Sequence, residues 1–322
     1  MEAALTTLTS PVILFFLLGG LAAFARSDLA IPEAMAKGLS IYLMIAIGLK
    51  GGIEVSKTGF TPDLLIAAAA GLTLSFLIPF IAFALLRTIG RLDRTNAGAV
   101  AAHYGSVSVV TFVAASEILT KQGLGAAGYM VAVLALMETP AIISGLFLAR
   151  RGTKVADAGP SRSSNLLHEV LLNASVVLLV GSFVIGLVAG PSGFEPIKPV
   201  FEGLFRGLLA IFLLDMGLVA GRRLLETRSL TARLAALAVA LPLINGTIGT
   251  VIGVLIGLDT GSAAALGILA ASASYIAVPA AMRLALPQAD PGLYLSMSLG
   301  VTFPFNIIIG IPLFAALART LS

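Results

Sequence analysis

The chain contains no cysteine and only two histidines among its 322 residues. The lack of cysteine excludes disulfide frameworks, thiolate zinc sites and thiol catalysis together. The sequence also lacks a glycine-rich Walker loop and a dinucleotide-binding fingerprint, so it carries no recognisable nucleotide-binding element. If the protein moves solutes, an ion gradient must therefore drive it.

Charged residues are scarce as well. They make up 11% of the chain, against 58% hydrophobic residues, and the mean hydropathy is +1.04, far outside the range of a soluble domain. A helix needs about 20 apolar residues to cross the hydrocarbon core of a bilayer. The sequence offers about ten such stretches, at 11–25, 31–50, 62–87, 98–116, 126–149, 168–189, 198–221, 230–257, 261–285 and 292–318. It predicts an all-α membrane protein of ten transmembrane helices.

The few basic residues fall mostly on one side of these helices. Alternating assignment of the loops places thirteen on one side: Arg26, Arg87, Arg91, Arg94, Arg150, Arg151, Lys154, Arg162, Arg222, Arg223, Arg228, Arg233 and Arg283. Five fall on the other: Lys50, Lys57, Lys121, Lys198 and Arg319. The positive-inside rule then predicts a multi-pass protein of the inner (plasma) membrane, with both termini outside and a cytoplasmic linker at 151–167. This orientation explains the net charge of +4 without a nucleic-acid partner.

The N-terminal apolar run ends in Ala23-Phe24-Ala25, which resembles a signal-peptidase site. It carries Glu2 and no basic residue before Arg26, whereas a signal peptide needs a positive n-region. We therefore expect a transmembrane helix here.

Short motifs recur on either side of the linker. The matching pairs are 37–39 with 206–208, 48–52 with 217–221, and 106–108 with 272–274. The first two pairs lie 169 residues apart and the third 166, so chance similarity in a biased alphabet is a weak explanation. Five helices per half is an odd number, which predicts an inverted repeat of residues 1–150 and 168–322. Such repeats are typical of secondary transporters, whose substrate site lies where discontinuous helices meet at the midplane.

Two otherwise apolar stretches are interrupted by small and hydroxyl residues, at 103–111 and 271–279. Pro279 lacks an amide proton and crowds the carbonyl of Tyr275, which favours a break there. If both helices break and cross, the N-termini of the half-helices point their amides at one volume, which is an anion site. The alternative is that Ser and Gly only permit close helix packing. His103 is more simply an interhelical hydrogen-bonding group than a proton relay.

Carboxylates inside apolar spans are candidates for function, since each costs about 2.5–3.5 kcal/mol at a helix centre. Glu138 lies about midway along its span, and Asp215 about two turns from the basic end. Sodium prefers hard oxygen ligands, which Asn306 beside Pro304 also offers. The alternatives are a structural ion pair for Asp215, with Arg206 or a cytoplasmic arginine, and a helix contact for Glu138. Arg206 and its repeat equivalent Lys37 are expected to snorkel or to face a cavity, and balancing charge in the pathway is the weaker alternative.

At these motifs the sequence resembles the SbtA-type sodium-dependent bicarbonate transporters of cyanobacteria and other bacteria. The resembling stretches cover almost the whole chain in the right order: 31–34, 47–52, 104–112, 138–142, 212–218, 271–280 and 303–306. The resemblance implies two inverted five-helix repeats with crossed, discontinuous fourth and ninth helices, as in bile-acid transporters and sodium–proton antiporters. Helices one, two, six and seven would form a gate domain and the other six a core domain.

The resemblance also implies the site and the partners. The anion would meet Gly105, Ser106, Val107, Ser108, Ser272, Ala273, Ser274 and Tyr275. The sodium candidates are Glu138, Thr302 and Asn306, with Asp215 on a gate-domain helix. No cofactor is expected beyond sodium as the coupling ion. Family members assemble as homotrimers, and cyanobacterial ones are inhibited by a small cytoplasmic PII-like protein, although the linker here is short for that role.

Three other functions compete with sodium–bicarbonate symport. A transporter of the same architecture could carry another small anion, such as a small carboxylate. A cation–proton antiporter would need carboxylates at the crossover itself, where the sequence has Ser, Gly and Ala. A membrane-embedded enzyme would need clustered His, Asp or Glu, which the sequence does not show, so we expect no enzymatic activity.

Overall fold

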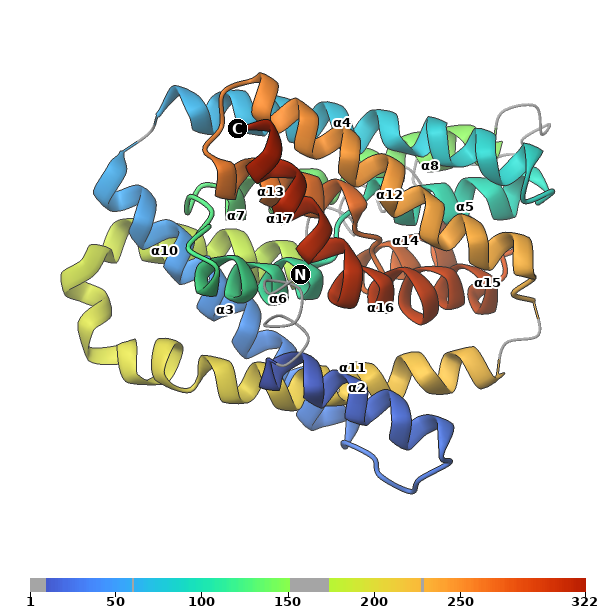
Figure 1. Cartoon of the computed structure of the whole chain (residues 1–322), viewed down its shortest axis with the longest axis horizontal. Helices are drawn as coiled ribbons and strands as arrows, with labels where there is room; N and C mark the ends of the chain where they lie inside the picture. Colours follow the sequence, from blue (N-terminus) through green and yellow to red (C-terminus); the bar gives the residue numbers. More distant parts are fainter. Residues whose placement is uncertain (1–9, 60, 151–173, 227–228) are drawn as a thin grey trace.

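The computed structural model describes residues 10–59, 61–150, 174–226 and 229–322, and the described part is helical without strands (Figure 1). Its α-helices are α2 (Pro11–Phe24), α3 (Glu33–Thr58), α4 (Pro62–Thr88), α5 (Arg94–Gly105), α6 (Val109–Lys121), α7 (Met130–Met137), α8 (Pro140–Arg150), α10 (Ala174–Phe194), α11 (Phe205–Glu226), α12 (Ala232–Leu255), α13 (Thr260–Ala271), α14 (Ala277–Ala285), α15 (Pro291–Leu295), α16 (Phe303–Phe305) and α17 (Ile311–Leu321). Short 3-10 or π turns are η1 (Glu195–Ile197), η2 (Pro199–Gly203), η3 (Ser296–Thr302) and η4 (Asn306–Gly310). The predicted linker at 151–167 lies outside the described residues.

Seven segments of the described chain are long and apolar enough to cross a membrane: Glu33–Thr58, Pro62–Thr88, Arg94–Lys121, Met130–Arg150, Val177–Ile197, Ala232–Leu255 and Pro291–Leu321. Two apolar helices, α2 and α13, are shorter. Helix α11 has 22 residues but carries five charges along its length. Each of the ten apolar stretches in the sequence thus contains a helix. Seven of these stretches contain a helical segment that is long and apolar enough to cross a membrane.

Long-chain apolar residues cover the outside of the helix bundle. Leu65 of α4 is 68% exposed, Val188 of α10 is 81% exposed, and Leu255 of α12 is 78% exposed. Exposed apolar side chains in this number indicate contact with another apolar phase. Together with the seven long apolar segments, it indicates a multi-pass membrane protein.

Helices α5, α6 and α13 form the centre of the molecule, between α4 and α12 on one side and α2 and α11 on the other (Figure 1). All residues from 97 to 115 and from 261 to 275 are buried, as expected for helices that are apolar all round. Aspartates cap the N-termini of α5 and α13: Asp93 accepts the Asn96 amide at 3.0 Å, and Asp259 accepts the Ser262 amide at 2.9 Å. Both caps therefore fix the start of a central helix.

Glycines bring two pairs of helices into close contact. A Cβ at Gly52 of α3 would lie 1.9 Å from the Phe183 carbonyl oxygen of α10, and one at Gly217 of α11 would lie 2.1 Å from the Phe16 carbonyl oxygen of α2. Backbones can approach this closely only where no side chain intervenes. The recurring glycines of the two halves thus pack α3 against α10 and α11 against α2.

Replacing Gly52 by valine should separate α3 from α10. Because the added Cβ meets backbone rather than a flexible side chain, we expect a loss of about 2 kcal/mol or more in unfolding free energy, seen as a lower midpoint of thermal unfolding in detergent. Gly38→Val is the matched control, since a Cβ at Gly38 of the same helix has no neighbour within 4 Å. Equal stability of the two variants would contradict this packing.

Candidate functional site

The first interruption of a central helix lies between α5 and α6. Helix α5 ends at Gly105, Ser106 is extended with ψ 171°, and α6 begins at Val109. A Cβ at Gly105 would lie 2.3 Å from Cγ of Pro79 on α4, so the chain can pass there only with glycine. The Ser108 hydroxyl accepts the Thr111 amide at 3.2 Å and caps the new helix.

The second interruption lies between α13 and α14, and it touches the first. Helix α13 ends at Ala271 and α14 begins at Ala277. The Ser274 amide donates to the His103 carbonyl at 2.9 Å, and the Ser108 amide donates to the Ser272 hydroxyl at 3.0 Å. The hydrogen bonds of the interrupted backbones are therefore made between the two breaks.

A small pocket lies where the breaks meet. Four predicted anion-site residues line it, together with one predicted sodium ligand: Val107, Ser108, Ser274, Tyr275 and Glu138. The space of about 10 Å³ holds roughly one water-sized sphere. Val109 and Ala277, the first residues of α6 and α14, also line it. Two helix N-termini, whose first-turn amides have no partner one turn earlier in the same helix and which carry the positive end of a dipole, therefore border one volume.

The other four predicted anion-site residues support the breaks and do not line the pocket. Gly105 packs on Pro79, as described above. The Ser106 hydroxyl donates to the Glu138 carbonyl at 3.2 Å, and the Ser272 hydroxyl donates to the Leu269 carbonyl at 2.8 Å. Ala273 is buried beside them.

Glu138 reaches the pocket from a turn between α7 and α8. Pro140 has no amide to donate to the preceding turn, and hydroxyls from other helices take two of the carbonyls there. Ser75 of α4 donates to Met137 at 2.6 Å, and Ser106 donates to Glu138 itself. The Glu138 side chain is buried, and within the described chain its Oε2 atom has no hydrogen-bond partner. An unpaired buried carboxylate oxygen is costly and is suited to a cation.

Thr302 and Asn306 lie on the π-helical turns η3 and η4, on either side of the α16 turn. Such turns are rare and occur frequently at functional sites. The Thr302 hydroxyl lies 2.7 Å from the Tyr104 hydroxyl near the end of α5, and the Asn306 amide donates to the Ala271 carbonyl at the end of α13 at 2.8 Å. Both residues thus bind the ends of the interrupted helices. The Asn306 Oδ1 atom is buried and has no hydrogen-bond partner in the described residues.

Asp215 stands apart from this group. It is buried on α11, and no hydrogen bond in the described part of the chain joins it to either break. The charge that acts on it is that of Arg222, two turns further along the same helix. Arg206 does not pair with it, because Arg206 contacts Glu117 at 2.6 Å. The placement favours the structural alternative for Asp215.

Asn245 is a polar residue that the sequence interpretation missed. It is fully buried on α12, and neither its amide nitrogen nor its amide oxygen has a partner in the described chain. The signal was a lone asparagine in the apolar run from 241 to 246, since polar residues inside membrane spans are candidates for function by default.

Comparison with known proteins gives one family. The family model described as the Na+-dependent bicarbonate transporter superfamily matches residues 11–319. No curated protein matches the sequence. The match covers both interrupted helices, the Glu138 turn and the π-helical turns.

Proposed function

Because the chain belongs to the Na+-dependent bicarbonate transporter superfamily, we propose that it is a symporter that takes up bicarbonate with sodium by alternating access. The observation that carries the proposal is the pocket at the meeting breaks, where two helix N-termini and one unpaired carboxylate border the same volume. The helix ends favour an anion, and the carboxylate favours a cation.

Bicarbonate is the proposed cargo because it is small, planar and negatively charged. Its oxygens would accept from first-turn amides of α6 and α14, with the Ser108 and Ser274 hydroxyls beside them. The pocket holds about one water, so the helices must separate slightly to admit even this anion. Larger carboxylates would need a larger displacement, which supports bicarbonate over them.

Sodium would neutralise Glu138 before the anion arrives. Without a cation, the Glu138 carboxylate would repel an anion in the same pocket. Thr302 and Asn306 would contribute hydroxyl and amide oxygens, and both already contact the ends of α5 and α13. A sodium ion held by these groups would order the interrupted helices, and each ion would raise the affinity of the other by the same factor. Asp215 remains a weaker candidate, as its position is remote from the breaks.

An inverted repeat of two five-helix halves, 1–150 and 168–322, accounts for the symmetry of the packing. Helices α5 and α13 both have 12 residues and a capping aspartate, Asp93 or Asp259. Each is followed by an extended serine, Ser106 or Ser272. The two glycine-mediated pairs, α3 with α10 and α11 with α2, are equivalent under the same operation.

We assign α2, α3, α10 and α11 to a gate domain and the other helices to a core domain. The basic residues support an orientation in the inner membrane with both termini outside. Homotrimer assembly and a cytoplasmic PII-like regulator stay predictions from the family resemblance. The two domains would move against one another to expose the pocket to either side in turn.

Uptake of labelled bicarbonate into proteoliposomes tests the proposal. An inward sodium gradient should raise the initial rate at least about tenfold over an equal potassium gradient. Unlabelled formate, acetate and nitrate, each added with and without sodium, report anion selectivity. Uptake that ignores the sodium gradient would refute the symport, and stronger competition by a carboxylate than by bicarbonate would identify the alternative cargo.

A further inference from the structure

A second and much larger cavity lies at the other end of α6. Its volume is about 690 Å³, within the range of small-molecule sites. It is enclosed by α3, α6, the segment before α7, η2 and the start of α11. The orientation proposed above places it on the outer side. We call it the outer vestibule.

Helix α6 connects the outer vestibule to the central pocket. Val109 lines the pocket and Glu117 lines the vestibule, and eight residues of helix span about 12 Å. Between the two lies a narrow apolar space that is lined by Leu43, Met44 and Val113, among others. The vestibule therefore lies at the outer end of the helix that borders the pocket, and an apolar constriction lies along α6 between them.

Two cations with unused donors face the vestibule. The Arg206 side chain of α11 is 61% exposed, and its Nε atom lies 2.6 Å from Oε1 of the nearly buried Glu117. In the described chain its other guanidinium nitrogens make no hydrogen bond. The Lys50 ammonium of α3 lies 4.9 Å above the Phe205 ring. Both side chains can thus accept a further anionic partner.

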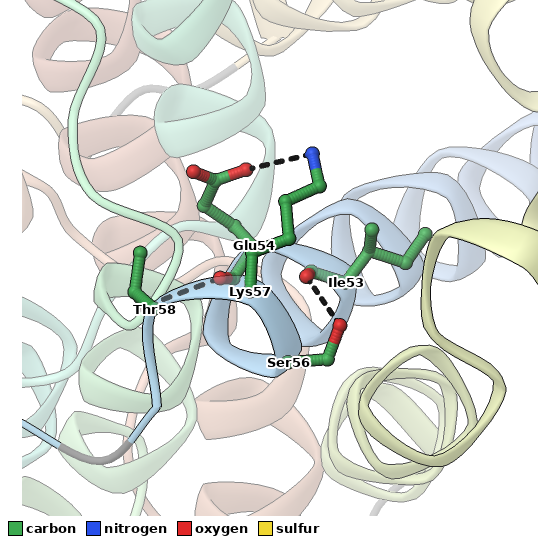
Figure 2. Close-up of polar contacts among 5 residues, drawn as sticks. All are labelled: Ile53, Glu54, Ser56, Lys57 and Thr58. Carbon is green, nitrogen blue, oxygen red and sulfur yellow. Dashed lines mark hydrogen bonds and ion pairs between the residues drawn. The ribbon is translucent and has the colours of Figure 1, made fainter.

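The carboxylates around the vestibule are largely neutralised already. Glu54 pairs with Lys57 at 3.4 Å at the end of α3 (Figure 2). Lys121 lies 3.5 Å from the same Glu117 oxygen that Arg206 contacts. The lining itself has two basic side chains and three carboxylates, of which Glu202 is the third, and Lys57 and Lys121 pair with the other two carboxylates from outside the lining. Only when these two lysines are counted do basic side chains outnumber the carboxylates, by four to three.

We propose that the outer vestibule is an entry site for the transported anion, where Arg206 and Lys50 bind it and Glu117 competes with it for Arg206. A planar carboxylate-like anion makes the same charge-assisted contacts with a guanidinium as a glutamate side chain does. An arriving anion would take over Arg206, and Glu117 would keep Lys121 as its partner. The inference rests on the proposed uptake of anions from this side.

Opposite shifts in KM test the entry site. In sodium-driven bicarbonate uptake, Arg206→Gln should raise KM about tenfold because a charge-assisted contact is lost, and Lys50→Gln should raise it as well, both with little change in maximal rate. Glu117→Gln removes the competitor and should lower KM. Lys198→Gln is the matched control, since Lys198 pairs with Glu195 at the same end and does not line the cavity.

Two outcomes would overturn the entry site. If Arg206→Gln and Glu117→Gln both lower the maximal rate at constant KM, the pair only holds α6 and α11 together and does not bind the anion. If neither these variants nor Lys50→Gln move KM, the vestibule binds no anion. Protection of purified protein from thermal unfolding by bicarbonate gives the same comparison without transport. Sodium dependence of the unaltered protein, measured in parallel, tells failure of the symport apart from failure of the entry site.

Discussion

Replacing Glu138 by glutamine is expected to lower sodium-driven bicarbonate uptake by about 100-fold, the upper range of coupling between two ligands. Glutamine keeps the size of the side chain and removes its charge. The buried Oε2 atom, which has no partner in the described chain, would then no longer attract sodium. The same change removes the repulsion that the anion meets in the pocket.

This variant should therefore separate binding from transport. Bicarbonate should bind to purified Glu138→Gln protein whether or not sodium is present, and sodium should no longer raise its affinity. Glu195→Gln is the control, because Glu195 is exposed and pairs with Lys198 across one helical turn. Sodium-stimulated uptake by Glu138→Gln at the rate of the unaltered protein would show that Glu138 is no sodium ligand.

The helix interruptions were predictable because their causes are local. Small and hydroxyl residues weaken a helix, and proline removes an amide, so the stretches around Gly105 and Pro279 read as breaks from sequence alone. The structure has these breaks, ending α5 at Gly105 and starting α14 at Ala277. The sequence did not reveal which serine faces the pocket: Ser106 and Ser272 turn to carbonyls, whereas Ser108 and Ser274 line it.

Contacts between distant segments were beyond the reach of the sequence. Arg206 and Lys37 occupy equivalent repeat positions, and both are expected to snorkel or to face a cavity. Arg206 lines the outer vestibule, where it also meets Glu117, a residue on a helix of the other half. Nothing in the local pattern around either residue signals that pair, since the approach of α6 to α11 is set by packing of the whole bundle. The same holds for the contact between Thr302 and Tyr104.

Filling the central pocket should stop transport without unfolding the protein. Ser274→Leu adds carbon atoms to a space that holds about one water. We expect uptake to fall by about 100-fold or more, because small displacements of reacting or binding groups have effects of this order. Ser274→Ala keeps the space but loses the acceptor for the Val278 amide. Uptake by Ser274→Ala should fall only about tenfold, which corresponds to the loss of one hydrogen bond.

The comparison must exclude a simple packing defect. Thr73→Leu is the control, since Thr73 is exposed on α4 and its hydroxyl donates to the Ala69 carbonyl in the same helix. Gel filtration and thermal unfolding in detergent should show that Ser274→Leu assembles like the control. Uptake that is lowest with leucine, intermediate with alanine and highest with serine at position 274 follows only if the added volume blocks the anion. If folded Ser274→Leu protein transports as well as Thr73→Leu protein, the anion binds elsewhere, and the paired helix N-termini have a structural role alone.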